Sequence, residues 1–220
     1  MPARGSKAAR IARAGRIADK LARLYPDARV TLDFKTPWQL LAATILSAQC
    51  TDERVNMVTP ALFRRYPDPQ ATAAAELREL ERLVVTTGFF RQKARSLKAA
   101  AKQIVQCYRG EVPASMDALV KLPGVGRKTA NVVLGHAFGI PGIAVDTHVR
   151  RVAYRLGLTG QSDPDKIEAD LRELLPPEKW TAFSMRLILH GRRVCVARRP
   201  RCSECALLAD CHRKGVRTAL

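Results

Sequence analysis

The sequence lacks any long apolar segment. Its longest candidate, residues 40–48, is interrupted by Thr44 and Ser47 and falls well short of the roughly 20 apolar residues that a membrane-spanning helix needs. The N-terminus also lacks the apolar core of a secretory signal, although its Arg- and Ala-rich, acid-poor stretch faintly resembles an organelle transit peptide. We therefore expect no membrane partner and interpret the N-terminal stretch as a solvated basic helix.

Runs of alternating apolar and polar residues, which are typical of β-strands, are scarce, and there is no fixed repeat or low-complexity linker. Apolar residues mostly recur at helical spacing, which predicts an all-α fold class. Thr36-Pro37 and Asp163-Pro164 are typical helix starts, and Gly88, Gly110 and Gly157 are plausible helix stops. We expect helices over about residues 37–49, 52–65, 76–86, 91–108, 115–121, 127–138, 147–156, 164–175 and 177–190.

Acidic residues are few. The chain of 220 residues has 20 Asp and Glu against 38 Lys and Arg, a formal net charge of +18 that favours a polyanionic partner, with nucleic acid the first candidate. Residues 1–29 and 191–220 each carry eight basic and two acidic side chains. Both ends also contain apolar or cysteine anchors, so we expect them to fold and to form one basic surface.

A glycine-rich string stands near the middle of the chain: Leu122-Pro123-Gly124-Val125-Gly126-Arg127-Lys128-Thr129-Ala130-Asn131. Glycines at 124 and 126 permit positive φ and close backbone approach, so amides can point at an anion where the next helix begins. For Gly-x-Gly alone, an ordinary connection between packed helices is the better interpretation. The whole string between two expected helices favours a grip on DNA phosphates that does not depend on base sequence.

Lys128 lies in the first turn of the expected helix, where the helix dipole disfavours the ammonium form and so favours a nucleophilic amine. The alternative role is a simple phosphate contact. Asp146 precedes a helix that begins near Thr147, a position typical of an N-cap. Held near Lys128, Asp146 could also take the lysine's proton or stabilise positive charge on a sugar, so we predict Lys128 and Asp146 as the catalytic residues.

Four cysteines share one short loop, with the spacing Cys195-x6-Cys202-x2-Cys205-x5-Cys211. Four thiolates in so short a span imply a metal. Structural zinc more often uses paired Cys-x-x-Cys knuckles, of which only one is present, and a reducing compartment disfavours disulfides. The spacing therefore favours an iron–sulfur cluster over zinc.

Arginines crowd around the first two of these cysteines. They either form a phosphate-binding surface or offset the negative charge of the thiolates, and some can do both. The residues concerned are Arg192, Arg193, Arg198, Arg199 and Arg201.

Together, these features resemble the endonuclease III family, the bifunctional DNA glycosylase/abasic-site lyases of the helix-hairpin-helix superfamily. The resemblance spans residues 46–211. It is carried by Leu46-Ser47-Ala48-Gln49-x-Thr51-Asp52, by the string from Leu122 to Leu134, by Ala144-Val145-Asp146-Thr147-His148, by His190-Gly191-Arg192 and by the four cysteines.

The resemblance implies two helical domains with a DNA-binding groove between them. Residues 30–140 would form a six-helix barrel that contains the helix-hairpin-helix, and residues 1–29 plus 141–220 a discontinuous domain whose four cysteines bind a [4Fe-4S] cluster. The implied activity is removal of oxidised pyrimidines from duplex DNA in base excision repair. Lys128 would attack C1′ and form a Schiff base, Asp146 would assist, and β-elimination would cleave the strand.

The resemblance also implies the DNA contacts. Gln49 matches a position that fills the site vacated by the extruded nucleotide, and Phe89 lies in a wedge loop where relatives usually carry an aliphatic residue. A larger wedge could alter lesion preference or simply stack. The further expected contacts are Leu122, Gly124, Gly126, Arg127, Thr129, His148, Arg192, Arg198, Arg199 and Arg201.

The expected partner is double-stranded DNA with damaged bases or abasic sites, bound by a monomer in the reducing cytoplasm near the nucleoid. One alternative is a monofunctional adenine glycosylase, which lacks the lysine; the absence of a C-terminal domain after Leu220 also speaks against it. The other alternative is a non-catalytic helix-hairpin-helix DNA-binding module with structural zinc.

Overall fold

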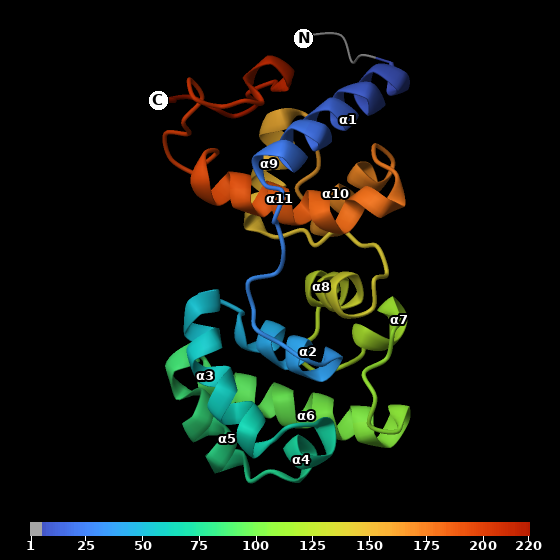
Figure 1. Ribbon diagram of the computed structural model, residues 1–220, viewed down its shortest axis with the longest axis vertical. Helices are drawn as coiled ribbons and strands as arrows, with labels where there is room; N and C mark the ends of the chain where they lie inside the picture. The colour runs from blue at the N-terminus through green and yellow to red at the C-terminus, as the bar shows by residue number, and fades with distance from the viewer. Residues whose placement is uncertain (1–5) are drawn as a thin grey trace. The chain divides into compact units, whose positions relative to one another are not determined.

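The computed structural model describes residues 6–220, and every regular element in that range is a helix (Figure 1). The all-α prediction is therefore confirmed. The chain forms two compact units, one of residues Val30–Ile140 and one that combines the described residues up to Arg29 with Pro141–Leu220. Residues 1–5, which the expected domain 1–29 includes, lie outside the described range. Within residues 6–220, each helix is too short or too polar to cross a lipid bilayer.

The unit of residues 30–140 is built around α2 (Pro37–Leu46), which packs against α3, α6 and α8. Thr36 caps α2 by accepting a hydrogen bond from the Gln39 amide, and Pro37 occupies the first turn, as the sequence predicts. The residues of α2 are buried almost all around, which is the pattern of a central helix. The other helices of this unit are α3 (Asp52–Arg65), α4 (Pro69–Ala74), α5 (Leu77–Val84), η1 (Val85–Thr87), α6 (Phe90–Tyr108), α7 (Met116–Leu119) and α8 (Arg127–Ala137).

The second unit packs the N-terminal helix α1 (Lys7–Leu24) against the C-terminal part of the chain. Helix α11 (Trp180–Arg193) contacts both α1 and α9 (Thr147–Leu156), and Figure 1 shows α1 running across this group. Ile17 and Leu21 of α1 are fully buried in a core shared with Phe183. The remaining elements are α10 (Pro164–Arg172), η2 (Pro177–Lys179) and η3 (Leu208–Asp210).

Most expected helices are present, with differences at their ends. Helix α2 stops at Leu46 rather than near Gln49, because Ser47 caps it and Gln49 takes a left-handed conformation with φ of 52°. Helix α11 begins at Trp180 rather than at residue 177, because Pro177 starts a separate 3-10 turn. Helix α4 was not expected from the sequence, since six residues are too short to show a helical period. Gly157 ends α9 in the left-handed conformation, as predicted.

Candidate functional site

The glycine-rich string forms a tight turn between α7 and α8. Its two glycines differ in backbone conformation and in the space around them. Gly124 has φ of 79°, and a Cβ built on it would lie 2.8 Å from the Cβ of Ser96 on α6. Gly126 has φ of −94° and open space around its Cβ position, so it does not use the positive φ that glycine permits. Only Gly124 needs glycine for the fold itself. Gly126 is the N-cap of α8. Because glycine has no side chain, the first backbone amides of α8 receive no capping hydrogen bond from this residue.

Lys128 lies in the first turn of α8, and its side chain is exposed. The flanking Arg127 and Thr129 are partly buried. Leu122 is only 2% exposed and packs beneath the turn, so only its backbone can face a ligand. The structure thus presents a lysine amine beside a glycine-rich helix start, which is the arrangement that the sequence predicts for this segment.

Gln49 and Phe89 are exposed residues of the same unit and share an unusual backbone conformation. Their φ angles are 52° and 47°, in the left-handed region that residues other than glycine rarely adopt. Gln49 follows the C-terminus of α2, and Phe89 immediately precedes α6. Phe89 is 68% exposed, a large apolar side chain directed to solvent. Isolated exposed apolar residues are common, and the left-handed conformation also occurs at Arg109, Arg199 and Arg213, so these features by themselves assign no role to Gln49 or Phe89.

Asp146 belongs to the other unit, where it is the N-cap of α9. Its Oδ1 accepts a hydrogen bond from the Val149 amide at 2.8 Å, so the predicted capping role is present. Within residues 6–220, the second carboxylate oxygen has no hydrogen-bond partner, and the side chain is partly exposed. The carboxylate therefore keeps one oxygen for a role beyond the cap.

His148 lies in the first turn of the same helix and is held by Arg151. The Arg151 guanidinium donates to His148 Nδ1 at 3.1 Å and to the Gly191 carbonyl at 2.9 Å. Burial lowers the pKa of His148, an effect that Asp146 opposes and Arg151 reinforces. Because a guanidinium can only donate, Nδ1 accepts, and a neutral His148 carries its proton on Nε2.

Gly191 of the His190-Gly191-Arg192 segment lies where α11 meets α9. A Cβ at this position would lie 3.0 Å from His148 Cβ and 3.1 Å from Val152 Cγ2. The close approach of the two helices therefore depends on the missing side chain. Among the expected DNA contacts of the C-terminal region, Arg192, Arg198, Arg199 and Arg201 have exposed side chains.

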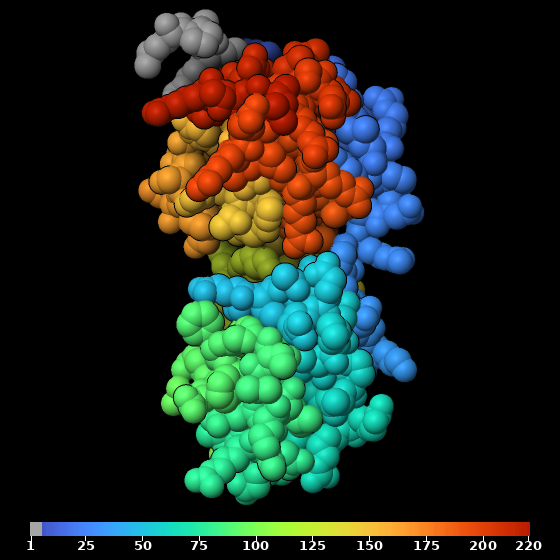
Figure 2. All heavy atoms as spheres, turned by 90° about the vertical axis from the view of Figure 1, so that its left-hand side faces the viewer, coloured from blue at the N-terminus to red at the C-terminus, as the bar shows by residue number. Residues whose placement is uncertain are grey.

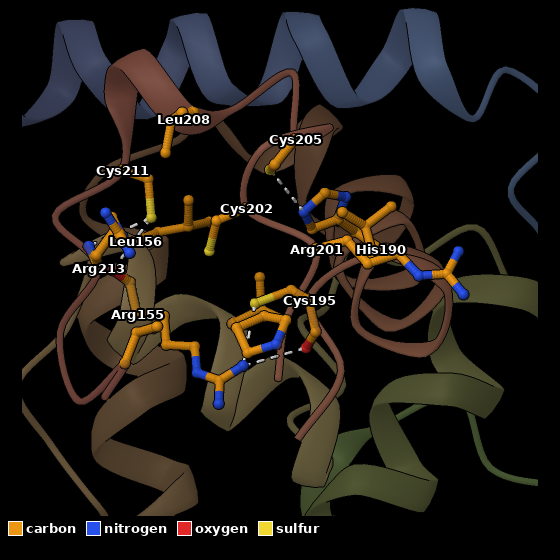
Figure 3. A pocket seen from close by; sticks show the side chains of 14 residues that line it. Arg155, Leu156, His190, Cys195, Arg201, Cys202, Cys205, Leu208, Cys211 and Arg213 are labelled. Atoms are coloured by element: carbon orange, nitrogen blue, oxygen red, sulfur yellow. Dashed lines mark hydrogen bonds between the residues drawn. The ribbon is translucent and has the colours of Figure 1, made fainter. Parts of the chain in front are cut away.

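The four cysteines of the C-terminal loop line one pocket (Figure 3). Each is partly buried, and none forms a disulfide. Burial raises the pKa of the Cys205 and Cys211 thiols, so thiolates in this pocket require a compensating cation. Within residues 6–220, no three His, Cys, Asp or Glu side chains are arranged to hold a single metal ion. The four potential donors that share this pocket are all thiols, the ligand type that both structural zinc sites and iron–sulfur clusters use.

Arg155 is buried beside the pocket, although the sequence analysis did not select it. Its guanidinium donates to the carbonyls of Val196 at 2.7 Å and Ala197 at 2.8 Å, and lies 3.5 Å from Cys195 Sγ. Arg151 likewise donates to the Cys195 carbonyl. These contacts tie the first cysteine to α9. The sequence did contain an indication that Arg155 is buried, because it follows Val152 by three residues and so falls on the apolar face of its helix.

His190 connects the pocket with the N-terminal segment. Its Nε2 lies 3.6 Å from Cys205 Sγ, and its Nδ1 lies 3.1 Å from the Tyr25 hydroxyl. Burial lowers the pKa of His190 to about 4, so the ring is neutral. In the tautomer that accepts from Tyr25, the Nε2–H donates toward the cysteine sulfur. No sequence pattern relates Tyr25 to a residue 165 positions away.

Three cations of α1 bind the C-terminal loop. Arg16 and Lys20 donate to the carboxylate of Asp210 at 2.9 Å each, and Asp210 is only 8% exposed. Arg13 donates to the backbone carbonyls of Asp210 and Gly157. Figure 2 shows the N-terminal segment in blue beside the red C-terminal segment. The interpretation of the N-terminus as a merely solvated basic helix is therefore wrong, since part of its charge is used inside the unit.

Three comparisons agree on the family. Residues 42–177 match the HhH-GPD superfamily base excision DNA repair protein family. Endonuclease III of Synechocystis sp. (strain ATCC 27184 / PCC 6803 / Kazusa) is 58% identical over 192 residues, which cover 87% of this chain and 88% of the relative. Endonuclease III of Bacillus subtilis (strain 168) is 47% identical over 194 residues, covering 88% of this chain and 89% of the relative.

Solved structures give the same result. A trapped endonuclease III–DNA covalent intermediate, the estranged-adenine complex, superimposes with a TM-score of 0.86 at 44% identity and covers 91% of this chain and 96% of that one. Sequence and structure thus agree over nearly the whole length of both chains. The chain belongs to the endonuclease III family within the HhH-GPD superfamily.

Proposed function

We propose that this protein removes oxidised pyrimidines from duplex DNA with Lys128 as nucleophile and Asp146 as its assisting carboxylate. Membership of the endonuclease III family makes the protein a DNA glycosylase of base excision repair with abasic-site lyase activity. The observation that carries the residue assignment is an exposed lysine in the first turn of the helix that follows the glycine-rich turn.

In this mechanism, the Lys128 amine attacks C1′ of a nucleotide extruded from the duplex. The bond from C1′ to the base breaks, the base leaves with the bonding electrons, and opening of the sugar ring gives an imine between Lys128 and C1′. Loss of a proton from C2′ then drives β-elimination of the 3′ phosphate, which cleaves the strand. Water hydrolyses the imine and releases Lys128.

Asp146 supports this chemistry electrostatically and as a base. Its capping bond to Val149 fixes the carboxylate through Oδ1, which leaves Oδ2 to accept a proton or to face positive charge on the sugar. Lys128 and Asp146 belong to different compact units, so the proposal requires both units to contribute to one site.

The proposed DNA contacts fall into two classes. Extruding a nucleotide costs a few kcal/mol, and we assign Gln49 and Phe89 to the space that the nucleotide vacates. The remaining contacts would hold the phosphate backbone and fix the register without reading bases. These are the backbone around Leu122, Gly124 and Gly126, the side chains of Arg127, Thr129 and His148, and the arginines Arg192, Arg198, Arg199 and Arg201.

Cys195, Cys202, Cys205 and Cys211 would hold a [4Fe-4S] cluster, in accordance with the family. Their common pocket and all-thiolate donor set fit such a group. Bound there, the cluster would brace the loop that carries the exposed arginines. On this view, residues 30–140 are the barrel domain with the hairpin, and residues 1–29 plus 141–220 are the cluster domain.

A thiolate-bound cluster requires a reducing compartment, so we place the protein in the cytoplasm, associated with the nucleoid. One extruded nucleotide and one site require only a monomer. The absorption of iron–sulfur charge transfer in the visible range distinguishes this cofactor from colourless zinc, and a colourless, zinc-bearing protein would favour the non-catalytic DNA-binding alternative.

The test is borohydride trapping on duplex DNA that carries thymine glycol or an abasic site. Wild type should form a covalent adduct that Lys128→Ala abolishes, while Lys121→Ala, which removes another exposed lysine at the start of the same turn, should still form it. If wild type forms no covalent adduct, or if Lys128→Ala forms as much adduct as wild type, the proposal that Lys128 is the lyase nucleophile is wrong.

Asp146→Asn separates the two roles of the aspartate. Asparagine is an equally good N-cap, so the variant should keep its fold and its affinity for DNA while losing turnover. Equal loss of binding and turnover would make Asp146 structural. Base release without strand cleavage by wild type would instead favour the monofunctional glycosylase alternative.

A further inference from the structure

Helix α6 buries a lysine that the proposed mechanism does not use. Lys93 is only 5% exposed and shares a helix face with Leu97, Ala100 and Ile104, all fully or nearly fully buried. Lysine rarely occupies such a position without a partner, because its ammonium group loses water on burial. The bonds that Lys93 makes therefore explain its presence.

Lys93 makes two hydrogen bonds that bracket one glycine. Its ammonium donates to the carbonyl of Thr87 at 2.6 Å, and its backbone N–H donates to the carbonyl of Phe89 at 3.1 Å. The two acceptors stand on either side of Gly88. The backbone bond is the first i→i−4 bond of α6 and does not depend on the side chain at this position, whereas the bond to Thr87 requires the lysine ammonium.

The turn has few other restraints. Gly88 and Phe89 have φ of 70° and 47°, and Phe89 starts α6 without any side-chain capping bond. Thr87 is buried and donates its hydroxyl to the Val84 carbonyl at 2.8 Å, so the carbonyl that Lys93 holds belongs to a well-anchored residue. Phe89 itself extends into solvent. The Lys93 ammonium therefore holds the backbone two residues before Phe89, at the carbonyl of Thr87.

We propose that Lys93 is a positioning residue for Phe89: it holds the turn in the conformation that inserts the ring into the duplex when a nucleotide is extruded. The inference rests on the proposed function, in which Phe89 is a wedge. A buried methionine of similar length would suit the apolar face better, so the hydrogen bond to Thr87 is what distinguishes lysine at this position. Burial lowers the pKa of Lys93, an effect that Cys50 opposes.

The experiment compares Lys93→Met with Lys98→Met. Lys98 is on the same helix and donates to the Ala75 carbonyl at 2.5 Å, so it is a matched lysine away from the turn. Single-turnover excision of thymine glycol is measured in fully paired duplex and in a duplex that lacks the base opposite the lesion. Fluorescence of 2-aminopurine beside the lesion reports insertion of the ring.

Lys93→Met should lower the single-turnover rate constant of excision on the paired duplex by roughly tenfold and weaken the 2-aminopurine signal, because a misplaced wedge extrudes the nucleotide less often. The effect should shrink on the duplex without an opposing base. Lys98→Met should match wild type on both duplexes, and Lys93→Arg, which keeps a charged donor, should recover most of the loss.

A double-mutant cycle with Phe89→Ala decides whether Lys93 acts through the ring. If it does, Lys93→Met changes little once Phe89 is already alanine. Independent, additive losses would overturn the proposal, as would a wild-type 2-aminopurine signal in Lys93→Met. If Lys93→Met does not fold, Lys93→Gln, a shorter neutral donor, enters the same cycle and is judged by the same criteria.

Failure of this inference is distinguishable from failure of the proposed function. Borohydride trapping of wild type establishes the lyase chemistry without reference to the wedge. A trapped wild-type adduct together with additive losses rejects the role of Lys93 alone, whereas no trapped adduct rejects the function on which it rests.

Discussion

Gly124 and Gly126 stand two residues apart, but substitution by alanine should affect them differently. Gly124→Ala places a Cβ against Ser96 at a positive φ and should destabilise the protein by about 1–3 kcal/mol. Gly126→Ala meets no neighbouring atom and should change stability by less than about 1 kcal/mol, while weakening affinity for duplex DNA because the Cβ obstructs approach of a phosphate.

Chemical denaturation measures the first effect, and titration of each folded variant with duplex DNA measures the second. If both substitutions destabilise the protein equally, the claim that the fold requires glycine at 124 but not at 126 is wrong. Unchanged DNA affinity in Gly126→Ala would contradict close approach of the backbone to phosphate.

Lys93 predicts a pH dependence of stability. Burial lowers its pKa in the folded protein below the ordinary value of about 10.4. The cost of burying the charge is therefore complete below the folded pKa and disappears as pH rises from that value to the unfolded one. The free energy of unfolding of wild type should accordingly rise relative to that of Lys93→Met between neutral and alkaline pH.

Paired urea denaturations at several pH values measure this difference. They are repeated in a Cys50→Ala background, because the Cys50 thiol is the titratable group that acts on Lys93. A difference that stays constant, or that moves in the opposite direction, would show that burial does not penalise the charged form of Lys93.

At the scale of elements, the N-terminal helix holds the cysteine loop. Asp210 precedes Cys211 and accepts from Arg16 and Lys20 of α1, so α1 and the loop should lose stability together. Asp210→Ala should cost about 1–3 kcal/mol, because it removes a buried carboxylate that accepts charge-assisted hydrogen bonds from Lys20 and from the more exposed Arg16. If the loop holds the proposed cluster, this substitution should also speed the loss of iron from the purified protein.

Asp19→Ala is the control in the same helix, since Asp19 forms an exposed ion pair with Lys179. It should cost less than about 1 kcal/mol and leave the release of iron unchanged. Thermal unfolding and colorimetric iron release measure both effects. Iron release from Asp210→Ala at the wild-type rate would show that the contacts of α1 with Asp210 do not help to retain the cluster.

The helix pattern was predictable to different degrees along the chain. Helix α9 has the expected bounds because Asp146 caps its start and Gly157 ends it, and both signals are local. Helix α2 ends early because the left-handed Gln49 belongs to a loop whose conformation no local pattern indicates. Ends set by caps are therefore readable from sequence, whereas ends set by neighbouring packing are not.

For the whole molecule, the net charge of +18 overstates the charge that can face a polyanion. Arg13, Arg16 and Lys20 are used to hold the C-terminal loop, while Arg198, Arg199 and Arg201 are exposed. The dependence of DNA affinity on salt should reflect this division. Each phosphate contact contributes about −0.9 to the slope of log Kobs against log salt concentration.

Arg198→Ala and Arg199→Ala should each make that slope less steep by about one unit, provided each arginine contacts one phosphate. Lys20→Met removes the same charge and should leave the slope unchanged. Binding isotherms at several salt concentrations measure all three. A shallower slope for Lys20→Met would show that the cations of α1 contact DNA despite their bonds to Asp210.

The sequence by itself determined the helical class, the glycine-rich turn between two helices, the capping role of Asp146 and the grouping of the four cysteines in one loop. Each of these depends on residues close together in the chain, where turn geometry, capping and spacing act directly. That Lys128 and Asp146 serve one site stays a prediction, because they belong to separate compact units. Only the tertiary structure decided that Tyr25 meets His190, that Asp210 receives the cations of α1 and that Lys93 spans the turn before Phe89. Those partners depend on how buried helix faces pack, and packing is a property of the assembled core rather than of any local run of residues.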